Sequence, residues 1–309
     1  MSLADFLVAH APFTLPRHLY SYVEGQTPLS TTPVVFGSLA FYLALIFGVQ
    51  AVMKNREPQR LNTLFQAHNV FLSAGSLVLL VLLLEEILPI IWHNGLFSAM
   101  CDNESWTPRM EFYYMINYYF KYVELLRHSL PCFQEKAPAY VFSYLPGDLL
   151  TLSLAFLHVF HHSATALLCY SQLIGKTSIS WTVISLNLTV HVLMYYYYYA
   201  TAGGAKIWWK KYLTMMQIIQ FVIDLFVVYF GTYGHFAATY YDGIIPHMGN
   251  CAGSETAALF GCGLLTSYLG LFINFYLQTY KKKPSKAPRA NGTNGVANGH
   301  ANGKTVKNE

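Results

Sequence analysis

Charged side chains are scarce in this sequence, at 11% of its 309 residues, whereas a soluble domain carries about 25%. Long stretches contain almost no charge, and the mean hydropathy is +0.33. This shortage argues against a water-soluble enzyme. A nucleic-acid partner is also excluded, because the net charge of +4 comes from short loops and the C-terminal end rather than from a basic surface.

Two further absences narrow the class. The first ten residues, MSLADFLVAH, have no basic segment followed by an apolar run, so we expect no cleavable signal peptide. Strand-like alternation with regularly spaced turns is missing, which argues against a membrane β-barrel. Helices are the other structure that satisfies its backbone hydrogen bonds in lipid, so the sequence predicts an all-α polytopic membrane protein.

The apolar stretches are long enough to cross a bilayer, which takes about 20 residues. We predict seven transmembrane helices. The third is short, polar and rich in Tyr and Phe, so we expect it to face protein or a cavity rather than lipid. The predicted spans are 33–53, 69–92, 109–126, 149–173, 179–199, 212–233 and 256–280.

Lysine and arginine predict the orientation, because they are enriched in cytosolic loops. Basic residues follow the first, third, fifth and seventh spans, whereas 234–255 has none. This pattern places the N-terminal segment 1–32 on the non-cytosolic side and the C-terminal segment 281–309 in the cytosol. The latter is polar and Gly/Asn-rich, and we expect it to be disordered. The basic residues are Lys54, Arg56, Arg60, Arg127, Lys136, Lys206, Lys210, Lys211, Lys281, Lys282, Lys283 and Lys286.

Two predictions concern the non-cytosolic loops. Asn103 begins an Asn-Glu-Ser glycosylation sequon. Cys101 and Cys251 fall in two different loops on this side, where disulfides form, so we predict that they pair; the alternative is two free thiols. The other cysteines read as small buried residues. They are Cys132, Cys169 and Cys262.

A histidine cluster lies inside the fourth span. His158, His161 and His162 are spaced i, i+3 and i+4, which puts them on one helix face. The next span, joined by a very short loop, adds His191. Polar groups inside a membrane are costly and usually mark function, so we expect the four imidazoles to converge on one catalytic cavity.

Such a cluster supports two kinds of chemistry. One is a di-iron site, as in membrane desaturases and hydroxylases, but those need around eight histidines in several boxes and this chain has one HxxHH. The other is metal-free acid–base or nucleophilic catalysis, with no metal or cofactor. A third interpretation, a non-enzymatic seven-span receptor or transporter, leaves HxxHH unexplained.

Four motifs resemble the ELO family of fatty acid elongases in its fungal form. The stretch around His158-Val-Phe-His-His162 is similar to the family's HxxHH region, and the stretch from His191 to Tyr198 resembles HVxMYxYY. Thr214 to Gln220 is similar to TxxQxxQ, and Lys121-Tyr-Val-Glu124 to the first half of KxxExxDT. The resemblance covers most of residues 30–280.

The resemblance implies a catalytic unit over 33–280, with six helices around an acyl tunnel and a seventh helix outside. The implied reaction condenses a long-chain acyl-CoA with malonyl-CoA in the endoplasmic reticulum membrane, next to other enzymes of the elongation cycle. His161 is then the nucleophile, aided by His158, His162 and His191. The implied substrate-binding residues are Lys121, Glu124, Asn187, Tyr195, Gln217 and Gln220, with Lys206, Lys210 and Lys211 facing the phosphates of CoA. For those lysines, the alternative is the positive-inside bias alone.

Residues 127–155 depart from the family pattern. Arg127 and His128 stand where the family has Asp-Thr, and the segment is about fourteen residues longer than the family's connection by comparison of the motif spacing. Two explanations remain open: an inserted segment with altered contacts, or a gene-model error such as a retained intron. At the C-terminal end, Lys307 alone fits a lysine-based retrieval signal.

Overall fold

The computed structural model describes residues 2–10, 12, 16–53, 61–134 and 149–281. Within these ranges, side chains are described except for 50, 53, 126–134 and 149–158. Every regular element in this part of the chain is helical, as the sequence predicts. Two short helices, α1 (Leu3–His10) and α2 (Arg17–Tyr20), precede the long ones.

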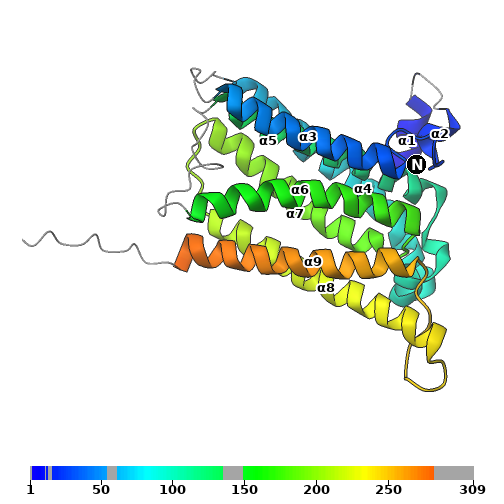
Figure 1. Ribbon diagram of the computed structural model, residues 1–309. Helices are drawn as coiled ribbons and strands as arrows, with labels where there is room; N and C mark the ends of the chain where they lie inside the picture. Colours follow the sequence, from blue (N-terminus) through cyan, green and yellow to red (C-terminus); the bar gives the residue numbers. More distant parts are fainter. Residues whose placement is uncertain (1, 11, 13–15, 54–60, 135–148, 282–309) are drawn as a thin grey trace, which may run out of the picture.

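Seven long helices lie side by side in the described part of the chain and form the body of the protein (Figure 1). A 3-10 turn, η1, lies between α4 and α5, and a π-helical turn, η2, follows α9. The bounds are α3 (Thr32–Met53), α4 (Asn62–Cys101), η1 (Asn103–Ser105), α5 (Pro108–Gln134), α6 (Leu149–Gly175), α7 (Ser180–Ala202), α8 (Lys210–Tyr240), α9 (Glu255–Tyr276) and η2 (Leu277–Lys281).

Four of the described helices are long and apolar enough to cross a membrane, which makes this a multi-pass membrane protein. They are α3, α4, α8 and α9 with its η2 extension. The helices α5 and α7 are rich in Tyr, and α5 also carries polar and charged groups on its inner face. That face is buried, with Tyr113, Tyr114 and Tyr118 each 4% exposed or less, as expected for a helix that faces protein.

Three predicted spans are much shorter than the helices in which they lie, and one of them, the sixth (212–233), lies in α8, which has 31 residues. The second was predicted as 69–92, but α4 has 40 residues and extends further at both ends. The helical backbone of α4 is interrupted at Gly95, whose φ of +85° lies in the region that glycine adopts without steric cost. The third was predicted as 109–126, but α5 has 27 residues and continues to Gln134, because polar and charged residues that end an apolar span do not by themselves end a helix.

Six of the long helices form a closed ring. Going round it, α4 packs along α7, α7 contacts α8, α8 packs against α9, α9 against α6, α6 against α5, and α5 returns to α4. Outside the ring, α3 packs mainly against α5. In lipid such packing depends on van der Waals contact and on polar groups between helices, rather than on hydrophobic burial.

The two ends of the ring carry different chemistry. At one end a disulfide between Cys101 and Cys251 joins α4 to the α8–α9 loop, and Ala252 N–H donates to the Cys101 carbonyl at 2.7 Å. We call this the disulfide end. At the other end α8 begins at Lys210 and η2 finishes at Lys281, and we call this the lysine end. The interior of the ring therefore lies between two chemically distinct ends.

Candidate active site

Three of the four predicted histidines meet inside the ring, halfway along α6. His161 and His162 of α6 and His191 of α7 are all buried, at 9%, 6% and 3% exposed. Adjacent positions on one helix point in different directions, so His161 and His162 make different contacts although their ring centroids are 5.1 Å apart. His158 lies on α6, but its side chain is outside the described residues.

A buried carboxylate from α5 organises two of the histidines. Glu124 Oε1 lies 3.1 Å from Lys121 Nζ and 3.1 Å from His191 Nδ1, and Glu124 Oε2 lies 3.5 Å from His162 Nδ1. Lys121 and Glu124 are each 2% exposed. An uncompensated buried charge is strongly destabilising, so the ammonium of Lys121 is what allows the carboxylate to stay here.

Asn187 fixes the proton position on His191. Lys121 Nζ can only donate, so the Asn187 amide oxygen, 2.9 Å away, accepts from it. The Asn187 amide nitrogen then faces His191 Nε2 at 3.3 Å and donates to it. His191 therefore carries its proton on Nδ1, the nitrogen beside Glu124, and keeps Nε2 as an acceptor.

His161 has apolar surroundings instead. Its ring packs against Tyr268, Phe272 and Phe221, with centroid distances of 4.6, 5.6 and 6.2 Å. Its backbone carbonyl accepts from the Thr165 hydroxyl at 2.5 Å and from the Tyr268 hydroxyl at 3.1 Å. His162 and His191 thus belong to a polar network with Glu124, Lys121 and Asn187, which we call the Glu124 network. The ring of His161 lies instead among aromatic side chains.

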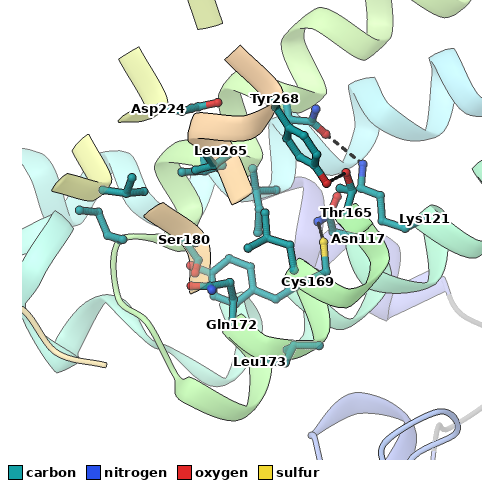
Figure 2. A pocket seen from close by; sticks show the side chains of 18 of the residues that line it. Asn117, Lys121, Thr165, Cys169, Gln172, Leu173, Ser180, Asp224, Leu265 and Tyr268 are labelled. Carbon is teal, nitrogen blue, oxygen red and sulfur yellow. Dashed lines mark hydrogen bonds between the residues drawn. The ribbon is translucent and has the colours of Figure 1, made fainter. Parts of the chain in front are cut away.

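Two cavities meet at His161. The first has a volume of about 440 Å³ and opens toward the lysine end, with Lys210, Thr214 and Gln217 in its wall. The second has a volume of about 70 Å³, is mostly apolar, and extends toward the disulfide end as far as Trp106 and Ser180. Figure 2 shows this second, narrow cavity, with side chains from several helices around it. We call them the wide cavity and the narrow cavity.

Four side chains line both cavities and define the junction between them: His161, Asn187, Gln220 and Phe221. His162 and His191 line the wide cavity, and Lys121 lines the narrow one. A molecule that occupies both cavities must pass His161. If one half of a ligand fills each cavity, the bond that joins the two halves lies at the junction, beside His161.

The remaining predicted binding residues divide into two groups. Gln217 and Lys210 line the wide cavity, as does Gln220 on the junction. Three others line neither cavity. Tyr195 is fully buried behind His191, with ring centroids 5.2 Å apart; Lys211 lies over the Tyr276 ring at 6.0 Å; and Lys206 is exposed.

Several residues of the site could not be picked out from the sequence. Phe221, Tyr268 and Phe272 surround His161, yet aromatic residues in an apolar span give no distinguishing signal. For Asp224 the sequence does offer a signal, because placing an acidic side chain inside the apolar span 212–233 is energetically costly and usually marks a functional residue. It is 0% exposed and lines the narrow cavity.

The cysteines fall into three situations. Cys101 and Cys251, predicted to pair, are joined in a disulfide. Cys262 is a buried thiol, but Cys169 is only partly buried and lines the narrow cavity, where the Asn117 amide donates to it at 3.5 Å. The side chain of Cys132 is outside the described residues, as is much of the atypical segment 127–155.

The described carboxylate and histidines of the site contact other protein groups. Among the described side chains, no group of three or more His, Cys, Asp and Glu is placed to hold a metal ion. The one carboxylate between His162 and His191 is Glu124, and it is already bound by the ammonium of Lys121. In the described part of the site, Glu124 therefore has protein groups on both carboxylate oxygens.

Comparison with known proteins gives one family. The model of the ELO, or GNS1/SUR4, family matches residues 27–288. The chain is 46% identical to putative fatty acid elongase 1 of Schizosaccharomyces pombe over 86% of this chain and 75% of that protein. It is 36% identical to putative fatty acid elongase 2 of the same yeast, over 95% and 75% of the two chains. It is also 34% identical to fatty acid elongase A of Dictyostelium discoideum, over 88% and 92%.

Proposed function

The chain belongs to the ELO family of fatty acid elongases, and we propose that it is a very-long-chain 3-oxoacyl-CoA synthase. In this reaction a long-chain acyl-CoA and malonyl-CoA give a 3-oxoacyl-CoA two carbons longer, CO2 and CoA. The single observation that carries the proposal is the position of His161 at the junction of a narrow apolar cavity and a wide cavity that has polar and basic side chains in part of its wall.

The two cavities match the two halves of an acyl-CoA. A fatty acyl chain is narrow and apolar, which suits the cavity that ends near Trp106 and Ser180. CoA is bulky and carries phosphates, which suits the cavity that has Lys210 in its wall. The thioester joins the two halves, so a substrate placed this way presents its reactive carbonyl at the junction, beside His161.

The mechanism we propose is ping-pong. A ring nitrogen of His161 attacks the thioester carbonyl, the C–S bond breaks, and the imidazole proton passes to the thiolate, so that CoA leaves as the thiol and an acyl-imidazole remains. Malonyl-CoA then enters the wide cavity and loses CO2. The resulting enolate attacks the acyl carbonyl, the acyl–nitrogen bond breaks, and His161 regains a proton from solvent. No cofactor takes part beyond the co-substrate malonyl-CoA.

The Glu124 network supplies the charge and the protons for these steps. His191 lines the wide cavity and keeps an unprotonated Nε2, because Asn187 and Glu124 set its tautomer. His162, also beside Glu124, lines the same cavity. We assign His191 to passing the imidazole proton of His161 to the departing thiolate, His162 to stabilising the charge that develops on the malonyl side, and His158 to orienting the nucleophile.

The topology we propose has seven membrane spans, α3 to α9, with the six-helix ring enclosing the acyl tunnel and α3 outside it. The disulfide end faces the lumen of the endoplasmic reticulum, where disulfides form, and the lysine end faces the cytosol, where acyl-CoA and malonyl-CoA are available. The N-terminus is then luminal and the C-terminus cytosolic. The neighbours are other enzymes of the elongation cycle, and the preferred substrates are saturated or monounsaturated long chains.

One experiment tests the core of this proposal. Microsomes or purified full-length protein are given a long-chain acyl-CoA and labelled malonyl-CoA, and the labelled 3-oxoacyl product is measured for wild type, His161→Ala and His93→Ala. His93 lies on α4, is exposed and lines neither cavity, so it is the matched control. We expect product from wild type and His93→Ala and none from His161→Ala.

The covalent step has its own test. Intact-protein mass spectrometry after incubation with acyl-CoA alone should show an acyl adduct on wild type that is missing from His161→Ala. If the wild type is active but carries no adduct, the acyl-imidazole intermediate is excluded, whereas the proposed condensation activity still stands. Metal analysis with about two irons per chain would instead replace the whole proposal by the desaturase or hydroxylase alternative.

A further inference from the structure

An acidic side chain lies in the wall of the narrow cavity with no cation beside it among the described residues. Asp224 is on α8 and is 0% exposed. Within the described part of the chain it forms no ion pair, and its hydrogen-bond partner is Gln220, four residues earlier on the same helix. A buried carboxyl group without a charge partner is costly, and the reaction as proposed so far does not use it.

The hydrogen bond between these side chains has a defined direction. Gln220 Nε2 donates to Asp224 Oδ2 at 3.0 Å, and the other carboxyl oxygen, Oδ1, is buried with no partner in the described part of the chain. Both residues line the narrow cavity, and Asp224 is among those labelled in Figure 2. Four residues of helix separate them by about 6 Å along its axis, so Asp224 lies deeper than the junction.

This contact decides which end of the Gln220 amide faces the junction. Because the amide nitrogen is held by Asp224, the amide oxygen Oε1 is the atom left to meet a ligand, and no described side chain or backbone group donates to it. Gln220 is itself 5% exposed and lines both cavities. Without Asp224 the amide would be free to turn its nitrogen to the same place.

The chemistry of the substrates indicates which donor could form a hydrogen bond to the Gln220 amide oxygen. A thioester contains only acceptors, so it gains nothing from an amide oxygen. The nearest donor in either substrate is the amide N–H of the CoA arm, which is two methylene groups from the thioester sulfur. That N–H is common to acyl-CoA and malonyl-CoA. An amide oxygen fixed at the junction is therefore a receptor for the part of CoA that both half-reactions share.

We infer that Asp224 is a positioning residue, which orients Gln220 so that its amide oxygen binds the N–H of the CoA arm next to the thioester. This inference rests on the proposed function, because it needs both CoA thioesters to reach the junction. It assigns Asp224 to the recognition of CoA, although the residue itself lies in the wall of the acyl cavity.

The test is a comparison of initial-rate kinetics for full-length wild type, Asp224→Leu and Asp224→Asn, with KM and kcat measured separately for acyl-CoA and malonyl-CoA. Leucine removes the acceptor, so we expect the KM for both substrates to rise roughly tenfold with kcat changed by less than about threefold. Asparagine keeps an acceptor oxygen for Gln220 Nε2, so both KM values should stay within about threefold of wild type.

Asn69→Leu is the matched control for loss of a buried polar group. Asn69 lies on α4, is 0% exposed, binds the Phe65 carbonyl in its own helix, and lines neither cavity. If Asn69→Leu and Asp224→Leu both lower the maximal rate and leave both KM values unchanged, Asp224 is only structural and the inference is wrong.

Two other outcomes would also overturn it. A change in KM for acyl-CoA alone, dependent on chain length, would make Asp224 a reader of the acyl chain. Equal kinetics for Asp224→Leu and wild type would remove any role. Failure of the proposed function is distinguishable from these outcomes, because wild type would then incorporate no malonyl label at all.

Discussion

Lys121 Nζ lies 3.1 Å from Glu124 Oε1, and both side chains are 2% exposed in the interior of the helix ring. This ion pair is the base on which the histidines are arranged, since the same carboxylate lies beside His162 and His191. The two charges can be removed one at a time or together. Variants of this pair can therefore distinguish an effect on the stability of the protein from an effect on its activity.

Glu124→Gln should strongly destabilise the protein, because it leaves the Lys121 ammonium buried without a counter-charge; breaking such a pair costs roughly 3–5 kcal/mol. Adding Lys121→Met should recover much of that stability. Neither variant should recover activity, since His162 and His191 have lost their carboxylate. Thermal unfolding in detergent and malonyl incorporation measure the two effects. A double variant no more stable than Glu124→Gln alone would contradict this account.

Asn187→Leu should lower kcat by roughly 10²–10⁴-fold, the usual contribution of a general acid or base, because His191 loses the donor that fixes its tautomer. Thermal stability should fall less than for Glu124→Gln, as Lys121 keeps its carboxylate. Thr189→Val is the control on the same helix, because Thr189 binds the Ser185 carbonyl and lines neither cavity. Equal rates for the two variants would exclude the proposed role of Asn187.

Gly261→Val should shorten the products. Gly261 lines the narrow cavity on α9, and a Cβ there would meet Gln172 at 3.6 Å and Leu168 at 3.9 Å, which are ordinary contacts. The added methyl groups then fill cavity space rather than strain the helix. Gly263→Val, where a Cβ meets nothing within 4 Å, is the control and should leave the products unchanged. Gas chromatography of the extracted fatty acids gives the chain lengths.

Lys210→Ala should raise the KM for acyl-CoA roughly tenfold, because a charge-assisted hydrogen bond contributes about 1.5–3 kcal/mol and Lys210 is in the wall of the wide cavity. Lys206→Ala should change it by less than about twofold, since both lysines are exposed but Lys206 lines neither cavity. The difference should shrink as salt is added. Equal effects of the two substitutions would mean that these lysines act only through the general positive charge of this end.

Replacing Cys101 by Ser should lower the free energy of unfolding by about 2–4 kcal/mol, the usual effect of losing a native disulfide. The disulfide closes a loop of 150 residues and joins α4 to the loop before α9. Cys262→Ser, which alters a free buried thiol, is the comparison variant. Peptide mapping without reductant should find Cys101 linked to Cys251 in wild type, and two free thiols there would contradict the pairing.

The sequence by itself determined the class of protein, the order of the helices and the family. Lipid imposes a simple rule, since a spanning segment must be apolar and helical, and this rule can be read one residue at a time. The i, i+3, i+4 spacing predicted for the same local reason that His158, His161 and His162 share one side of a helix. The lengths of α4 and α5 were underestimated because polar residues that end an apolar span do not by themselves end a helix.

Only the tertiary structure decided how the polar residues are divided. Glu124, on α5, binds His162 and His191 from two other helices, whereas His161 is surrounded by aromatic rings and meets both cavities. Tyr195 and Gln220 lie in motifs that look equally informative, yet one packs behind His191 and the other reaches the junction. Contacts between helices depend on the rotation of each helix in the ring, and that rotation is set by packing over the whole chain.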